Sequence, residues 1–336
     1  NLTGSPVCSD NVTDMCGAYY NCSNLTGSPV CGNNVTDMAR TYFQCYNLSG
    51  EPLCGDNVTN MARTYIDCYN LTGSPVCGDN VVNMFGAYFC CNNLTGSPVC
   101  GNNVTNFSFV YEGCYNLTGS PVCGDNVTSM NSTYYYCSNL TGSPVCGDNV
   151  TSMVKAYYYC NNLTGSPVCG NNVTNMHGTY ELCYNLTGSP VCGDNVIDMN
   201  SAYYHCDNLT GTCYINQAYK LNGSFMGANK VGNIIINISN DNHMLDVLDF
   251  WNETNLNFAF DRNTYNATMQ NVIFTNLNIY SDSIQNSINI WNSTLENNEA
   301  YTGFSIADNG YLYTSVYRAY NTLTNQYAYY CTRNAI

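Results

Sequence analysis

The chain has 336 residues, of which 45% are hydrophobic and only 9% are charged, whereas charged residues make up about 25% of a typical soluble domain. Its 23 acidic and 8 basic side chains give a formal charge of -15, so the chain lacks the basic surface that binds nucleic acid. The 22 cysteines predict an oxidising compartment and a disulfide framework, and therefore an extracellular protein that is secreted or held at a cell surface.

The sequence has no stretch of the roughly 18 consecutive apolar residues that a membrane helix needs. Residues 1–8, Asn-Leu-Thr-Gly-Ser-Pro-Val-Cys, do not have the charged and apolar parts of a signal peptide. We therefore expect a soluble, processed chain with no membrane span.

A 23-residue repeat dominates the first two thirds of the chain. Its opening segment, Asn-Leu-Thr-Gly-Ser-Pro-Val-Cys, returns with small changes, so that nine complete repeats fill residues 1–207 and a tenth stops short at Cys213. We number positions within each repeat from the asparagine that opens it. This unbroken period predicts a repeat solenoid over residues 1–213, in which each repeat stacks on the next.

Apolar side chains recur at positions 12, 15, 19 and 22 of the repeat, for example at Val127, Met130, Tyr134 and Cys137. This spacing is that of one face of a helix, and the Asp or Asn at position 10 is a suitable N-cap. We therefore predict a short helix and a loop in each repeat. The alternative is a β-solenoid with one coil per repeat, which the tyrosine-rich runs and the glycines at position 17 favour.

Eighteen cysteines lie at positions 8 and 22 of the nine repeats. A helix over positions 11–22 holds its two ends roughly 16 Å apart, which is too far for a bridge within one repeat. The predicted bridges therefore join position 22 of one repeat to position 8 of the next, and the alternative is pairing within each repeat with Cys213 bonded to Cys331. The predicted pairs are Cys22-Cys31, Cys45-Cys54, Cys68-Cys77, Cys91-Cys100, Cys114-Cys123, Cys137-Cys146, Cys160-Cys169, Cys183-Cys192 and Cys206-Cys213.

Asparagines in the pattern Asn-x-Ser/Thr accept N-linked glycans when x is not proline, and the sequence has 25 of them. Position 1 keeps the pattern in all ten occurrences, which predicts covalent glycans there. At position 11, Asn80 and Asn195 persist although Val82 and Ile197 break the pattern, so asparagines that cap turns explain this position equally well. The predicted acceptors are Asn1, Asn24, Asn47, Asn70, Asn93, Asn116, Asn139, Asn162, Asn185 and Asn208 at position 1, Asn11, Asn34, Asn57, Asn103, Asn126, Asn149 and Asn172 at position 11, and Asn21, Asn106, Asn131, Asn222, Asn237, Asn252, Asn266 and Asn292 elsewhere.

The composition changes after Cys213, since all nine prolines precede it and both tryptophans, Trp251 and Trp291, follow it. Residues 231–238, 256–260, 272–280, 288–291 and 311–317 are rich in β-formers, and Asp308-Asn309-Gly310 is a hairpin signal. These features predict a second domain over residues 214–336, an all-β sandwich-like fold.

No catalytic motif and no metal-ligand spacing is present, and the three histidines, His177, His205 and His243, are scattered. We therefore expect a protein that is not an enzyme and that takes no metal or cofactor. In general architecture the chain resembles glycosylated extracellular filaments and pilus-like surface fibres. The resemblance implies a structural subunit whose partners are other copies of itself, joined head to tail through the C-terminal domain.

Two other functions compete with that one. The first is an adhesin or carbohydrate-binding surface protein in which the repeats form a stalk. The second is an ice-binding solenoid, because threonines recur at positions 3 and 13; glycans on the neighbouring asparagines would obstruct such a surface.

Overall fold

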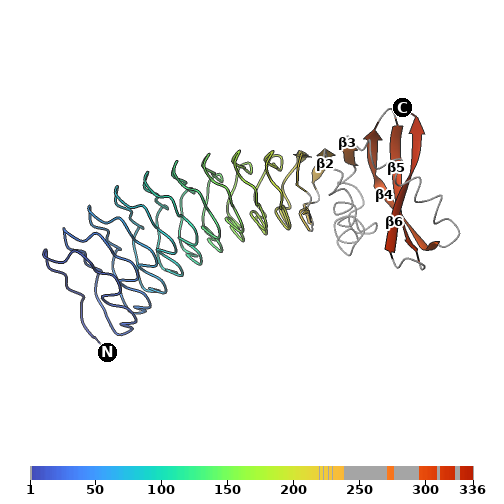
Figure 1. Cartoon of the computed structure of the whole chain (residues 1–336). Helices are drawn as coiled ribbons and strands as arrows, with labels where there is room; N and C mark the ends of the chain where they lie inside the picture. The colour runs from blue at the N-terminus through green and yellow to red at the C-terminus, as the bar shows by residue number, and fades with distance from the viewer. Residues whose placement is uncertain are drawn as a thin grey trace.

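The structure is a computed structural model that describes residues 2–218, 220–221, 223–225, 227–228, 230–237, 271–275, 295–308, 311–321 and 326–335. Residues 2–207 form consecutive coils that stack along one axis into a curved rod (Figure 1). Each coil comprises one 23-residue repeat, so coil 1 holds residues 1–23 and coil 9 holds residues 185–207.

Parallel backbone hydrogen bonds join equivalent segments of neighbouring coils. The N–H of Thr128, at position 13, donates to the carbonyl of Thr105 in the preceding coil at 3.0 Å, and the N–H of Tyr134, at position 19, donates to the carbonyl of Ala156 in the following coil at 2.8 Å. The same bonds recur along the rod, with isolated parallel bridges at position 14 from Asp14 to Asp198. Neighbouring coils are therefore about 4.8 Å apart, as hydrogen-bonded strands are.

The described residues contain no helix, so the helix that we predicted over positions 11–22 is wrong for this part of the chain. In coil 6 the N–H of Thr133 donates to the carbonyl of Met130, three residues back, while the alternate N–H groups of Ser132 and Tyr136 donate to the next coil. Ser132 (φ 50) and Tyr136 (φ 61) are left-handed, a conformation that an α-helix of L-residues excludes. Positions 17 and 21 are left-handed in the same way in the other described repeats, either as glycine or as another residue.

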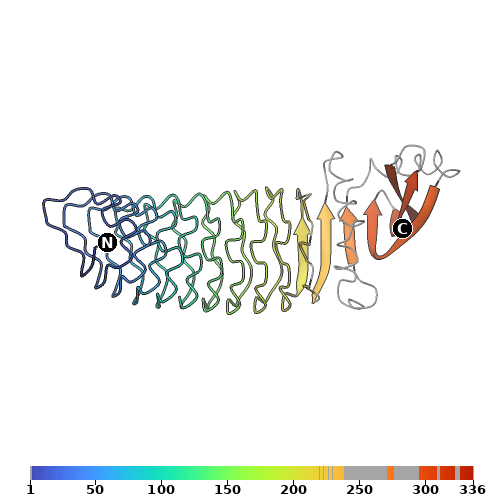
Figure 2. The ribbon, with the colours of Figure 1, turned by 90° about the horizontal axis from the view of Figure 1, so that it is seen from below.

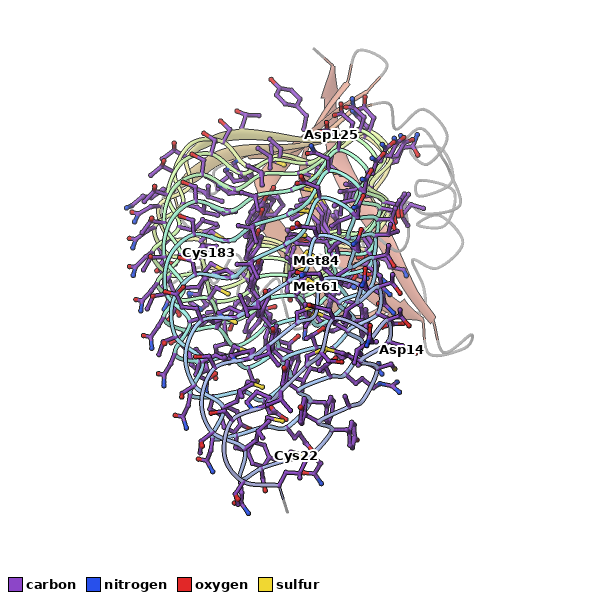
Figure 3. All side chains as sticks on the ribbon, turned by 90° about the vertical axis from the view of Figure 1, so that its left-hand side faces the viewer. Asp14, Cys22, Met61, Met84, Asp125 and Cys183 are labelled. Carbon is purple, nitrogen blue, oxygen red and sulfur yellow. The ribbon has the colours of Figure 1, made fainter. Side chains whose placement is uncertain are left out.

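The core of the rod consists of the apolar side chains that the sequence pattern identified. Leucine at position 2, valine at 12, methionine or phenylalanine at 15, tyrosine at 19 and cysteine at 22 are buried in the inner coils. The position-19 tyrosines stack face to face from coil to coil, with ring centroids 5.4 to 5.7 Å apart from Tyr19 to Tyr203. Met61 and Met84 lie inside the coils when the rod is viewed from its N-terminal end (Figure 3).

Each position-19 tyrosine also fixes the width of its coil. The hydroxyl of Tyr157 accepts a hydrogen bond from the N–H of Val145 at 3.0 Å and donates to the carbonyl of the same residue at 2.7 Å. Equivalent pairs recur from Tyr19 with Val7 to Tyr203 with Val191. The buried ring therefore links two segments that are 12 residues apart, and its hydroxyl satisfies both backbone polar groups of one residue.

The close approach of the coils explains the glycines at positions 4 and 9. A Cβ added to Gly142 would lie 3.0 Å from Ser120 Cβ and would overlap its hydroxyl oxygen, and Gly142 also has a φ of +83°. A Cβ on Gly170 would lie 2.9 Å from the carbonyl oxygen of Gly147 and 3.0 Å from Cys146 Sγ. Both positions therefore need glycine for the next coil to stack.

Stacking contacts continue beyond Cys213, across the boundary that we predicted between two domains. The ring of Phe225 stacks on Tyr203 at 5.7 Å, the N–H of Tyr203 donates to the carbonyl of Ser224, and Leu221, Ala228 and Val231 are buried. The equivalent residues here are 22 instead of 23 apart, as from Met199 to Leu221, which hides this coil from a search at fixed period. The boundary itself stays a prediction.

The described strands form one six-stranded sheet in sequence order: β1 (Gly211–Ile215), β2 (Val231–Asn237), β3 (Asn271–Thr275), β4 (Leu295–Asp308), β5 (Tyr311–Asn321) and β6 (Gln326–Ala335). β1 to β4 pair in parallel, and β4, β5 and β6 pair antiparallel. Figure 2 shows β1, β2 and β3 continuing the series of parallel segments at the end of the rod.

The hairpin that we predicted at residues 308–310 is confirmed, because Asp308 pairs with Tyr311 where β4 meets β5. The predicted runs at 231–238, 272–280 and 311–317 overlap β2, β3 and β5, whereas those at 256–260 and 288–291 lie outside the described residues. A second sheet is not among the described strands, so the sandwich-like domain over 214–336 stays a prediction.

Candidate functional site

Among the described residues no three His, Cys, Asp or Glu side chains come together as ligands for a metal ion. The backbone N–H of His177 donates to Asn175 Oδ1 at 2.9 Å, and the Nδ1 of His205 lies 3.5 Å from Asp207 Oδ1. His243 lies outside the described residues. The candidate functional surfaces in the described part of the chain are the rows of side chains that repeat from coil to coil.

The position-22 cysteines form a buried row along the rod. Cys160 Sγ donates to the carbonyl of Tyr134 in the preceding coil at 3.0 Å, and the same bond recurs from Cys45 to Cys206. Burial raises the pKa of the Cys160 thiol well above its usual range. These thiols are therefore protonated at neutral pH and react slowly.

The position-8 cysteines form a second, half-buried row. Cys146 Sγ lies 3.6 Å from the carbonyl oxygen of Gly147. Burial is the main reason that its pKa rises to about 12, and its neighbours in the row, Cys123 and Cys169, add to the effect. The described cysteines, which include the additional Cys16 and Cys90, are free thiols.

The structure joins none of the described cysteines in a disulfide, and the nine bridges that we predicted stay a prediction. We derived them from the separation of the two ends of a helix, and the described residues contain no such helix. Burial is the main reason that the pKa of Tyr111 lies well above its usual range, and Cys77 and Cys100 of one row and Cys114 of the other add to the effect. The pairs concerned are Cys22-Cys31, Cys45-Cys54, Cys68-Cys77, Cys91-Cys100, Cys114-Cys123, Cys137-Cys146, Cys160-Cys169, Cys183-Cys192 and Cys206-Cys213.

The asparagines at position 11 form an exposed row in which each side chain binds the coil before it. In coils 2 to 9 the Nδ2 group donates to the carbonyl of the position-10 residue of the preceding coil at 2.7 to 2.9 Å. Asn80 and Asn195 make this bond although Val82 and Ile197 break the glycosylation pattern. The hydrogen bond therefore accounts for asparagine at this position without a glycan.

The asparagines at position 1 are also largely exposed, but their bonds are less regular. Nδ2 of Asn47, Asn70, Asn116, Asn185 and Asn208 donates to a carbonyl of the preceding coil. By contrast, the exposed side chains of Asn24 and Asn93 take part in no side-chain hydrogen bond that the described structure contains.

The remaining predicted acceptors do not form a row. Asn21 is exposed and left-handed (φ 56). Oδ1 of Asn106 accepts from the N–H of Ser108, and Oδ1 of Asn131 accepts from the N–H of Val154. Asn237 belongs to β2. Outside the described residues lie Asn1, Asn222, Asn252, Asn266 and Asn292.

The residues two places after these asparagines differ between the two rows. Position 3 is Thr or Ser in every repeat, so a hydroxyl is always kept there. Position 13 is Thr, Val or Ile, so a β-branched side chain is always kept there, and Val82 and Ile197 are 43% and 39% exposed. The hydroxyl of Thr151 donates to the carbonyl of Thr128 at 3.1 Å, as its equivalents do along the row.

Aromatic side chains at positions 20 and 21 form short stacks on the surface of the rod. Tyr135 stacks on Tyr158 with centroids 4.6 Å apart, and Lys155 Nζ lies 5.7 Å from the Tyr158 ring. Tyr20 and Phe43 stack likewise at 4.8 Å. These clusters are confined to a few coils, unlike the rows of asparagine and threonine.

Comparison with known proteins gives one partial match. Residues 18–44 match the profile of the Kazal-type serine protease inhibitor domain, and no curated protein and no solved structure matches the chain. The match fits a cysteine-rich extracellular protein and is compatible with a protein that is not an enzyme. No helix in the described part of the chain is long and apolar enough to cross a membrane.

The matched segment runs from position 18 of coil 1 to position 21 of coil 2. Hydrogen bonds join Tyr19 to Thr41 within it, and join Met38 and Tyr42 to coil 3 outside it. The segment is thus part of the continuous stack, and its backbone contacts recur in the later coils.

Proposed function

We propose that the chain is a structural subunit of an extracellular filament or surface fibre, in which a β-solenoid rod serves as a stiff spacer. The observation that supports this function best is the unbroken stacking of equivalent residues from coil 1 to Val231. Each coil adds backbone hydrogen bonds and one more tyrosine to the same core. In a stack of this kind each repeat contacts only its neighbours, so the number of repeats sets the length of the rod.

In this proposal copies of the chain join head to tail, and the sheet that contains β4 to β6 is the joining element. The antiparallel edge strand β6 (Gln326–Ala335) pairs only with β5 among the described strands. An edge strand has unpaired backbone groups that can accept a strand from another molecule.

We further propose that glycans occupy the position-1 row, since the hydroxyl that the acceptor pattern requires is kept there in every repeat. Glycans are bulky, and coils are about 4.8 Å apart, so adjacent coils cannot both carry one. Asn93 is exposed and donates no side-chain hydrogen bond in the part of the chain that the structure describes, so it is the candidate that we choose for a test.

Electron microscopy of the purified full chain, secreted from a eukaryotic host, tests the proposed filament. We expect filaments of constant width, and a variant that lacks residues 326–336 should remain a single rod. A wild-type chain that stays monomeric at all concentrations would contradict assembly.

A second candidate function is protease inhibition, which the Kazal-type match at residues 18–44 favours. Titration of trypsin-like and subtilisin-like proteases with the full chain tests it. Stoichiometric inhibition that is lost when Pro29-Val30-Cys31 is replaced by alanines would establish this function for coil 2.

A further inference from the structure

The side chains at positions 11 and 13 of coils 1 to 9 form a surface that the proposed spacer function leaves unexplained. We refer to it as the Asn/Thr face. In every repeat Asn at position 11 and the β-branched residue at position 13 are exposed, and the valine between them packs in the core in coils 2 to 9. Outward and inward residues alternate here as in a β-strand.

The Asn/Thr face is uncharged and combines amides, hydroxyls and methyl groups. Asparagine occupies position 11 in all nine repeats, and position 13 holds seven threonines, one valine and one isoleucine. If this position served glycosylation of the asparagine, every repeat would need a hydroxyl group at position 13. Val82 and Ile197 have no hydroxyl group and share only the β-branched shape with threonine. The shape of the side chain is therefore the common property of the row.

Hydrogen bonds hold the side chains of this face in one conformation. The threonine hydroxyls of coils 2, 3 and 5 to 8 each donate to the position-13 carbonyl of the preceding coil at 3.1 to 3.4 Å. The asparagine amides donate likewise across coils. Because the single hydroxyl proton is donated to the preceding coil, only the acceptor capacity of the hydroxyl and the methyl group of each threonine remain for a partner.

The face is also periodic. The position-13 backbone bonds run without a gap from Thr13 to Lys220, with N–H to carbonyl distances of 2.8 to 3.2 Å. The same pair of side chains therefore recurs about every 4.8 Å along the rod. This repeat is close to that of the oxygen rows in the crystal lattice of hexagonal ice.

We infer that the Asn/Thr face binds the surface of ice crystals. A rigid array of amides, acceptor hydroxyls and methyl groups matches a neutral lattice of water, and the side chains at positions 11 and 13 have no charge that would select an ion or a charged polymer. The face has no aromatic side chain in any repeat, so it has no ring on which a sugar could stack. Acidic side chains such as Asp125 and Asp148 lie beside it at position 10 and are exposed. This activity is independent of filament assembly.

The test is thermal hysteresis and inhibition of ice recrystallisation, measured on the full chain made in a bacterial host that adds no N-glycans. The informative variant is Thr128→Tyr/Thr151→Tyr, which enlarges two side chains of the face in coils 6 and 7. Its matched control is Thr118→Tyr/Thr141→Tyr, which changes the exposed position-3 threonines of the same two coils. Thr128→Val/Thr151→Val keeps the β-branched shape, as Val82 does in coil 4.

We expect the wild type, the position-3 control and the valine variant to slow recrystallisation and to show hysteresis, and the position-13 tyrosine variant to lose most of both. Circular dichroism checks that all four chains fold alike, which we expect because each changed side chain points to solvent. No effect of the wild type on ice would overturn the inference, as would equal activity of the two tyrosine variants. Binding to insoluble cellulose or chitin without an effect on ice would also overturn it, in favour of a polysaccharide.

Discussion

Removing one hydroxyl group tests whether the position-19 tyrosines hold the coils in shape. In Tyr157→Phe the ring keeps its stacking partners, Tyr134 at 5.4 Å and Tyr180 at 5.5 Å. The N–H and carbonyl of Val145, however, lose their partner inside the rod. A buried polar group left without a hydrogen bond costs about 1–3 kcal/mol, so we expect the variant to lose about 2–4 kcal/mol of stability.

The matched control is Tyr19→Phe in coil 1. Tyr19 makes the same two bonds, to the N–H and carbonyl of Val7 at 2.8 and 2.6 Å, but Val7 is 78% exposed. Water can replace the lost hydroxyl there, so we expect a loss below about 1 kcal/mol.

Hydrogen exchange of the Val145 amide is the best assay, because a long repeat array need not unfold in one step. A loss of 2 kcal/mol or more predicts exchange that is roughly 30-fold faster in Tyr157→Phe. The midpoint of urea unfolding should fall as well. Equal effects of the two substitutions would refute the idea that the buried hydroxyl clamps the coil.

Four further predictions concern stacking, backbone strain, charge and modification. Gly142→Ala should unfold at a lower temperature than Gly4→Ala, because both glycines have a positive φ but only Gly142 has a neighbouring coil within 4 Å of the added Cβ; equal melting temperatures would contradict the stacking. Ser132→Gly should leave the free energy of unfolding unchanged or raise it by up to about 1 kcal/mol, because glycine adopts the left-handed conformation of Ser132 (φ 50) without strain. The control Ser138→Gly should lower the free energy of unfolding by about 0.5–1 kcal/mol. Urea denaturation measures both. Burial raises the pKa of Glu112 from 4.5 to about 7, so ionisation of this carboxyl group opposes folding. In thermal melts Glu112→Gln should be as stable as the wild type below pH 4.5. As the pH rises to 7 and above, the wild type should lose stability relative to the variant. Peptide mapping of the chain secreted from a eukaryotic host should find a glycan at Asn93 but little at Asn126 and Asn149. Uniform occupancy of both rows would contradict the role that we give to position 11.

The sequence pattern identified the buried positions but not the backbone that buries them. Val127, Met130, Tyr134 and Cys137 face the core, as a helix would also require. The left-handed residues Ser132 and Tyr136 turn the chain every few residues. Side chains on such a chain therefore point to the core at nearly the same spacing as on one face of a helix. The glycines at position 17, such as Gly86 and Gly178, were the available signal for these turns.

Contacts between coils were beyond sequence reasoning because they depend on one register along the whole rod. The bond from Tyr157 to Val145 spans 12 residues, and the bond from Asn149 reaches the carbonyl of Asp125, 24 residues back. Neither follows from local propensity. The glycine at position 9, which adjoins the preceding coil at Gly170, was visible as a nearly constant residue but has no helical explanation.

The central claim is that each 23-residue repeat forms one coil of a stack. The most direct test is solution X-ray scattering of the wild type and of a variant that lacks residues 93–161, which are three whole repeats. Three coils contribute about 14 Å to the length of the rod, so we predict a folded variant that is shorter by that amount. Repeats built from packed helices, whose axes lie about 8–10 Å apart, would shorten it by about 24–30 Å, and this result would contradict the stacked coil.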